Sequence, residues 1–355
     1  MPQENKREAG FELLRIIAML MIITLHYLSK GGAMQKMTVQ SDLYTGVLWL
    51  LESFCIVSVN VYVLISGYFL VESRWRPGKI LSVIAEVLFY SILVPVVLML
   101  LGVVDLSGWT MYDWMNVILP LETEHYWFAT SYVILYVLAP VLATAAKYMP
   151  KKQLQITIGL LVIFFSLTKS VNPLLLTTDQ YGYDFGWFIC LFLIAAYIRL
   201  YGTVFLNNVK KCFLVYTVFS VLGFCLSAVS AFIWHKTGQL EYYMDMPYCY
   251  NHLFVLIASV ALFCMAIHIH IPEGKAASLI CRIAPYTFGV YLLHENIVLR
   301  DIWPKWLQIE RVIDTPWIFL HLLASVLIVF LIGIMVDAFR ALLFRKFQRK
   351  VNRPV

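Results

Sequence analysis

An arginine and a histidine lie inside the first long apolar segment of the chain, "FELLRIIAMLMIITLHY" (residues 11–27). Arg15 and His26 are eleven residues apart, so at about 100° and 1.5 Å per residue they share one helix face and are separated by about 16 Å. Glu12 and Met19 lie on the same face. Because a charged group facing lipid is costly, we expect this stripe to face the interior of a helix bundle. There the imidazole could act as a base or a nucleophile, while Glu12 could simply pair with Arg15.

A second imidazole is followed directly by a carboxylate in a later apolar segment, "FGVYLLHENI" (residues 288–297). If this segment crosses the bilayer from the cytoplasm outward, His294 and Glu295 lie at about the depth of His26. Either group could orient the His26 ring or assist its proton transfer. Neighbours on a helix diverge by about 100°, so the sequence leaves open which of the two faces inward. We take all three residues as candidate catalytic groups.

Three cations lie close together in "ESRWRPGK" (residues 72–79), with a tryptophan between the first two. We call Arg74, Arg76 and Lys79 the loop cations. They could be ordinary positive charge on the cytoplasmic face of a membrane protein. They could also clamp a phosphorylated ligand, since Arg binds phosphate through two hydrogen bonds, with Trp75 stacked on a base or anchored among lipid headgroups.

The elements that would position these groups are transmembrane helices. Of 355 residues, 61% are hydrophobic and 14% charged, against roughly a quarter charged in soluble domains. The mean hydropathy is +0.79. We predict an all-α polytopic membrane protein, a single domain over residues 1–355 that forms a bundle of about ten helices. The predicted spans are residues 11–28, 47–70, 80–101, 126–147, 154–170, 184–201, 212–234, 249–271, 282–299 and 316–340.

The loop charges predict the orientation of the bundle. With the N-terminus in the cytoplasm, 19 of the 27 Lys and Arg residues fall on the cytoplasmic side and seven on the other. By the positive-inside rule, both termini are expected in the cytoplasm. The net charge of +6 then reflects orientation and does not indicate a nucleic-acid partner. The first segment has no small-x-small cleavage site after it, so we expect it to be retained.

The remaining candidates have structural interpretations. The seven cysteines form no C-x-x-C pair, so we expect packing roles and no metal site or disulfide framework. Four acids lie inside predicted spans: Glu12, Glu52, Glu86 and Glu295. Glu86 could pair with Lys79, seven residues earlier on the same helix face. His268 and His270 could be interfacial.

Five motifs in order make the chain resemble acyltransferase family 3, a family of bacterial integral-membrane acyltransferases. The family's opening helix carries a basic residue, ten further residues and a histidine, matched here by Arg15 and His26. Where the family has an R-x-x-R motif, this chain has Arg76-x-x-Lys79, which keeps the spacing and ends in lysine. Three further segments resemble later helices of the family: "NVYVLISGYFL" (60–70), "HYWFATSYVILYVLAPVL" (125–142) and "YTFGVYLLHENI" (286–297).

The resemblance implies an O-acyltransferase in a bacterial cytoplasmic membrane. It implies that acetyl-CoA or another acyl-CoA serves as co-substrate, with no resident cofactor, and that the acceptor is a hydroxyl of a surface glycan or lipid-linked sugar. The phosphates of the donor would bind the loop cations, and Arg15 would help to hold the entering donor.

The resemblance places His26 at the thioester, either as general base assisted by Glu295 or His294, or as a transient acyl carrier. Trp127 could stack on the acceptor sugar, although it could equally belong to the aromatic belt at the headgroups.

A transporter or flippase is the alternative function. Ten spans with buried charges also describe a secondary transporter, including the membrane module of a larger protein that moves a small metabolite or glycan. No inverted repeat and no matched pair of interrupted spans supports that alternative. We therefore expect an enzyme, and turnover of acyl-CoA against movement of a solute distinguishes the two.

Overall fold

The computed structural model describes residues 8–34, 43–173 and 180–351, and all regular structure within them is helical. In this described part, nine helical segments are long and apolar enough to cross a membrane. The shorter apolar helix α9 corresponds to the sixth predicted span, so all ten predicted spans have a helical counterpart. The principal helices are α1 (Ala9–Lys30), α2 (Leu43–Cys55), α3 (Ser58–Leu70), α4 (Pro77–Leu100), α5 (Met111–Ile118), α6 (Trp127–Tyr148), α7 (Lys151–Val162), α8 (Thr168–Val171), α9 (Phe185–Tyr201), α10 (Val209–Thr237), α11 (Tyr242–Asp245), α12 (Leu253–His268), α13 (Lys275–Ile283), α14 (Thr287–His294), α15 (Trp303–Trp306) and α16 (Ile318–Val351).

The all-α polytopic fold is confirmed, with two differences from the predicted spans that affect the site. The second span is broken into α2 and α3 by a turn at residues 56–57. The ninth span consists of α13 and α14 and ends at His294, so the prediction of helix to residue 299 is wrong. The side chain of Asn296 accepts a hydrogen bond from the Val298 N–H at 3.1 Å, and such a local side-chain turn competes with continuation of a helix.

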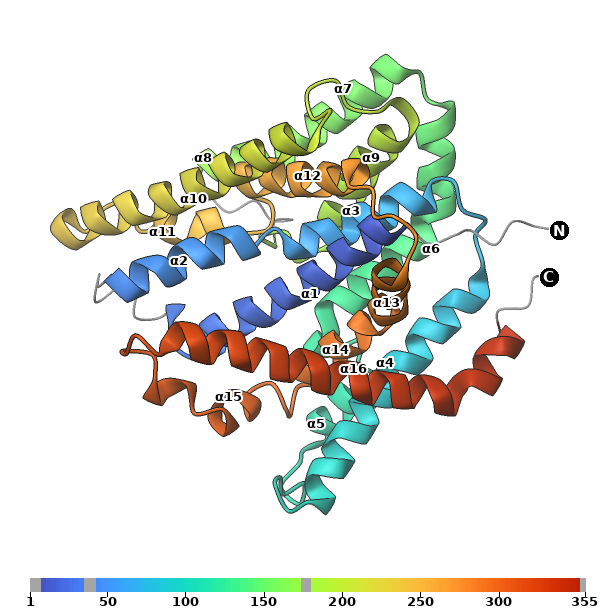
Figure 1. The fold of residues 1–355 in the computed structure, drawn as a ribbon, viewed down its shortest axis with the longest axis vertical. Helices are drawn as coiled ribbons and strands as arrows, with labels where there is room; N and C mark the ends of the chain where they lie inside the picture. The colour runs from blue at the N-terminus through green and yellow to red at the C-terminus, as the bar shows by residue number, and fades with distance from the viewer. Residues whose placement is uncertain (1–7, 35–42, 174–179, 352–355) are drawn as a thin grey trace.

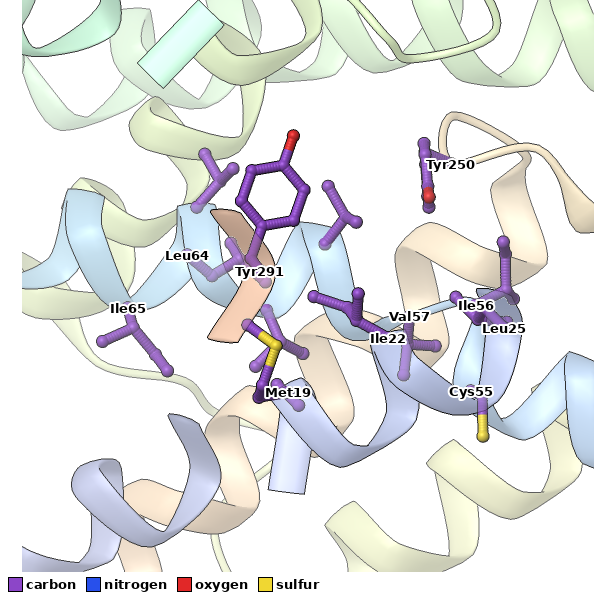
Figure 2. Packing of buried hydrophobic residues seen from close by; sticks show 14 of the residues in the cluster. Met19, Ile22, Leu25, Cys55, Ile56, Val57, Leu64, Ile65, Tyr250 and Tyr291 are labelled. Carbon is purple, nitrogen blue, oxygen red and sulfur yellow. The ribbon is translucent and has the colours of Figure 1, made fainter. Parts of the chain in front are cut away.

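Helix α1 runs through the middle of the bundle, between α2 and α3 on one side and α16 on the other (Figure 1). Its core residues Ala18, Ile23 and Tyr27 are fully buried. Met19 and Ile22 lie on the part of α1 that packs near the α2–α3 break, as the close view of the core shows (Figure 2). Glu12 and Met19 of the predicted stripe are buried, so the predicted inward orientation is confirmed at these two positions.

The beginning of α1 and the end of α16 lie on the same side of the bundle (Figure 1). We call this the terminal side, and we call the opposite side, where α1 ends and α15 lies, the distal side. The arrangement is the one expected for an even number of crossings, and it places the end of α3 and the start of α4 on the terminal side (Figure 1).

Helices α14 and α16 pack closely around a buried ion-pair network. Arg340 contacts Asp337 at 2.6 Å through Nε and Glu86 of α4 at 3.0 Å, and the Tyr90 hydroxyl donates to Asp337 at 2.9 Å. The sequence suggested Lys79 as the partner of Glu86, and the structure places Arg340 there instead. Sequence spacing can identify partners only within one helix. Arg340 reaches Glu86 because tertiary packing brings α16 beside α4.

Candidate functional site

Three ionisable side chains meet where α1 ends and α14 ends. His26 Nδ1 lies 2.9 Å from His294 Nε2 and 3.3 Å from Glu295 Oε1. His294 is 2% exposed, whereas His26 and Glu295 keep 21% and 14% of their side chains accessible. The structure therefore brings together the three residues that the sequence nominated as catalytic, and both neighbours approach the same nitrogen of His26.

The end of α14 explains how two consecutive side chains reach one atom. In a continuous helix they would point about 100° apart. Glu295 instead caps the helix, with φ −95° and ψ 7°, outside the regular helical conformation. The departure from the helix turns its carboxylate toward the atom that His294 contacts. The question that the sequence left open, which of the two faces His26, is answered by the geometry: both do.

The hydrogen bonds of the two histidines define where their protons lie. His294 Nδ1 is 2.6 Å from the carbonyl oxygen of Val290, which can only accept, so this nitrogen carries a proton. In the neutral ring, His294 Nε2 is then an acceptor, and His26 Nδ1 must donate to it. The lone pair of neutral His26 is consequently on Nε2, the ring atom not engaged with His294 or Glu295.

His125 and Tyr126 hold the end of α14 and the turn after it, which carries Glu295. Just before α6, His125 donates from Nδ1 to the Asn116 carbonyl at 2.8 Å and accepts the Ile297 N–H at Nε2, at 3.0 Å. The Tyr126 hydroxyl donates to the Leu292 carbonyl at 2.7 Å. Burial lowers the pKa of His125 from 6.5 to about 4, which keeps this ring neutral and able to accept.

Lys30, the last residue of α1, contacts two acids. Its Nζ is 3.7 Å from Glu295 Oε1 and 3.5 Å from Asp301 Oδ1. His26, His294 and Glu295 also offer three potential metal-ligand atoms within 4.8 Å of one another. A divalent ion bound there would have to displace the proton that His26 Nδ1 donates to His294.

A cavity of about 280 Å³ lies beside His26 and runs along α1. His26 and Glu295 line it, whereas His294 stands behind His26. Figure 2 shows Tyr291 and Tyr250 near this stretch of α1, the first from α14 and the second from the loop before α12. The other residues that line the cavity are Met19, Ile22, Leu25, Ser29, Glu52, Ile56, Val59, Tyr62, Trp127, Phe128, Tyr183, Tyr248 and Phe288.

Arg15 lies in the first half of α1, toward the terminal side. Its guanidinium pairs with Glu12 at 2.5 Å and lies 6.0 Å from the centroid of the Phe69 ring. Glu12 is buried, and the Tyr62 hydroxyl donates to the Arg15 carbonyl at 2.8 Å. Because Tyr62 also lines the cavity, Arg15 lies close to the end of the cavity that is farther from Ser29.

The loop cations are exposed on the terminal side and lie apart from the histidine pair. Their loop is docked on α6, since Trp75 Nε1 donates to the Tyr136 carbonyl at 3.2 Å and the Tyr136 hydroxyl donates to the Arg76 carbonyl at 3.2 Å. Tyr136 follows Phe128, a cavity residue, by eight positions on α6, which is about 12 Å along a helix. The loop cations and the cavity are therefore joined along one helix.

Sequence reasoning passed over the polar residues that line the cavity besides His26 and Glu295. Glu52 was recognised as an acid inside a span but was given no role, although an intramembrane acid is itself a sign of function. Tyr183, Tyr248 and Tyr250 come from segments near the membrane boundary, where tyrosine is common for other reasons. Trp127, by contrast, was nominated as a binding residue, and it lies in the lining.

The family model described as "Acyltransferase domain" matches residues 8–335, nearly the whole chain. The chain belongs to acyltransferase family 3. Every candidate residue named above lies within the matched region. No curated protein and no solved structure matches the chain. Membership of acyltransferase family 3, together with the helical bundle, shows that the protein is a multi-pass membrane acyltransferase.

Proposed function

We propose that the protein is an O-acyltransferase of the bacterial cytoplasmic membrane, which moves an acetyl or other short acyl group from acyl-CoA to a sugar hydroxyl. The observation that carries the proposal is the cavity-lining imidazole of His26, held at Nδ1 by His294 and Glu295 so that Nε2 keeps its lone pair. The acceptor would be a surface glycan or a lipid-linked sugar.

We propose that the terminal side is cytoplasmic and receives the donor. The loop cations suit the phosphates of CoA, which cannot enter hydrocarbon. The thin pantetheine arm would then pass along α6 and past Arg15, and bring the thioester to the cavity beside His26. The acceptor would approach from the distal side, near Ser29.

In the proposed reaction, His26 Nε2 accepts the proton of the acceptor hydroxyl as the oxygen attacks the thioester carbonyl. The C–S bond breaks, the acyl group stays on the sugar oxygen, and the CoA thiolate takes the proton from His26. His26 is positively charged between these steps, and the Glu295 carboxylate at 3.3 Å stabilises that charge. The same lone pair could instead attack the thioester and form an acyl-histidine, which is the second route.

The test is transfer of a labelled acetyl group from acetyl-CoA to glycan acceptors by the purified protein. His26→Ala should lower the rate by at least about 10²–10⁴, the usual worth of a general base, while acetyl-CoA binding and thermal stability stay close to the wild type. His235→Ala, the same change at an exposed histidine near the end of α10, is the matched control and should retain activity.

Normal transfer by a folded His26→Ala protein would remove His26 from the reaction. Movement of a solute across vesicles without consumption of acetyl-CoA would favour the transporter instead. A labelled acyl group recovered on His26 after rapid quenching would establish the acyl-histidine route.

A further inference from the structure

Glu52 is a buried acid that faces the same cavity as His26. It lies on α2, is 6% exposed and contributes to the cavity lining. Its Oε2 has no hydrogen-bond partner among the described residues. Burying a carboxylate oxygen without a partner is costly, so a ligand that brings hydrogen-bond donors into the cavity would be favoured.

The charge around the cavity restricts what that ligand can be. Two carboxyl groups, those of Glu52 and Glu295, line it, and none of the described residues that line it is Lys or Arg. Lys30, next to Ser29, is already engaged by Glu295 and Asp301. An anionic ligand would meet the Glu295 carboxylate in a region of low dielectric constant, and no described lining residue would supply a cation to compensate its charge.

One wall of the cavity is aromatic. Trp127, Tyr183 and Tyr250, which we call the aromatic wall, all line it. Ring centroids are 4.5 Å apart for Trp127 and Tyr183, and 4.8 Å apart for Tyr183 and Tyr250. The rings of Trp127 and Tyr250 are close to parallel, with an interplanar angle of 26°. A sugar ring has an apolar C–H face and a rim of hydroxyls, which match an aromatic surface beside a carboxylate.

Building on the proposed function, we propose that this cavity binds the acceptor as one electrically neutral sugar ring and excludes acidic sugars from the reacting position. Glu52 accepts hydrogen bonds from the ring hydroxyls, and the aromatic wall covers the C–H face. A volume of about 280 Å³ is at the lower limit of ligand pockets, which run from about 300 to 1,000 Å³, so it suits a single ring. Glu52 is therefore a determinant of acceptor specificity.

The test measures sugar binding in the absence of acyl-CoA, in protein carrying His26→Ala so that no turnover occurs. The probes are methyl glycosides of glucose, galactose and mannose, each paired with its uronic acid, which differs only at C6. At least one neutral glycoside should bind about tenfold or more tightly than its uronic acid. Adding Glu52→Gln, which replaces one acceptor oxygen by an amide donor, should weaken that binding by about tenfold, as expected for loss of a buried hydrogen bond. Glu241→Gln, at an exposed position, is the matched control and should leave the binding unchanged.

Equal or tighter binding of the uronic acids, no binding of any neutral glycoside, or unchanged binding after Glu52→Gln would each overturn this inference. Because the measurement needs no transfer, its failure is separate from failure of the proposed function. A protein that binds neutral sugars as described but never transfers an acyl group would overturn the reaction and leave the binding site standing.

Discussion

The candidate catalytic imidazole depends on residues that never touch the cavity. His294 orients His26 and is itself oriented by the Val290 carbonyl, so the proton positions follow from a backbone group one helical turn away. Glu295 in turn depends on the non-helical turn after α14, which is held by the His125 ring through the Ile297 N–H. Such supporting contacts decide whether a base is held in the orientation that proton transfer requires.

The support from His125 should fail in acid. Its folded pKa of about 4 lies below the unfolded value of 6.5, so the unfolded chain binds the proton more readily once the pH falls below 6.5. The stability that the neutral ring provides is complete above pH 6.5 and is lost progressively toward pH 4. By pH 5 the loss attributable to this group should be about 2 kcal/mol.

The measurement is the unfolding temperature in detergent between pH 7.5 and 5 for wild type and His125→Gln, which keeps an acceptor and a donor but does not titrate. The variant should be less stable at pH 7.5, and the difference between the two proteins should narrow by pH 5. A difference that stays constant over this range would show that His125 does not titrate on unfolding.

At the scale of elements, the contact of α14 with α16 positions His294. Two glycines allow it: a Cβ added to Gly289 would overlap the Asp337 carboxylate, and one added to Gly333 would lie 2.9 Å from the Val290 backbone. Because Asp337 is held by Arg340 and Tyr90, its side chain cannot simply turn away. The spacing of these helices therefore depends on the absence of two side chains.

Gly289→Ala should accordingly destabilise the protein by about 1–3 kcal/mol, the usual cost of overpacking, and lower transfer further by displacing α14 and its histidine. Gly159→Ala on α7 is the matched control, since a Cβ there meets no atom within 4 Å. That change should leave activity intact and stabilise the helix by about 0.5–1 kcal/mol. Equal behaviour of the two variants in unfolding and transfer assays would contradict the close-packing argument.

At the scale of the whole molecule, the loop cations and the histidine pair lie toward opposite sides of the bundle. The loop between α3 and α4, which carries the loop cations, lies on the terminal side with the start of α1 and the end of α16 (Figure 1). The histidine pair lies near the other end of α1, where α14 also ends. The cavity and α6 connect the two regions. Under the proposed function, the donor would enter from one compartment and the acceptor from the other, and only the acyl group would cross the membrane.

The placement of the loop cations on one side of the bundle predicts that acyl-CoA is used from that side of the membrane only. In sealed vesicles, acyl-CoA should support transfer only when it is supplied on the terminal side, where α1 begins and α16 ends. Changing Arg74, Arg76 and Lys79 together to Gln should raise the KM for acyl-CoA, most strongly at low salt, where screening is weakest. The matched control changes Lys147, Lys151 and Lys152 to Gln, which removes the same charge from the α6–α7 connection, and it should have a smaller effect. Transfer from either side, or equal effects of the two triple variants, would count against donor binding at the loop cations.

Sequence alone determined the class of fold and the inward stripe of α1. Apolar runs long enough for a bilayer are local features, and the spacing of Arg15 and His26 follows from helical periodicity, so neither needs tertiary information. His294 and Glu295 could be nominated for the same reason, as ionisable groups within an apolar segment.

Tertiary structure decided how those groups meet. The end of α14 at His294 lets Glu295 reach His26, and that ending depends on Asn296, whose side-chain amide donates to the Tyr90 carbonyl at 3.2 Å. The pairing of Glu86 with Arg340 and the opening of Glu52 onto the cavity likewise arise between helices distant in sequence. Periodicity specifies which face of a helix a residue occupies. Only the packing of whole helices specifies which residue that face meets, because this depends on close approaches, such as those at Gly289 and Gly333, between segments far apart in the chain.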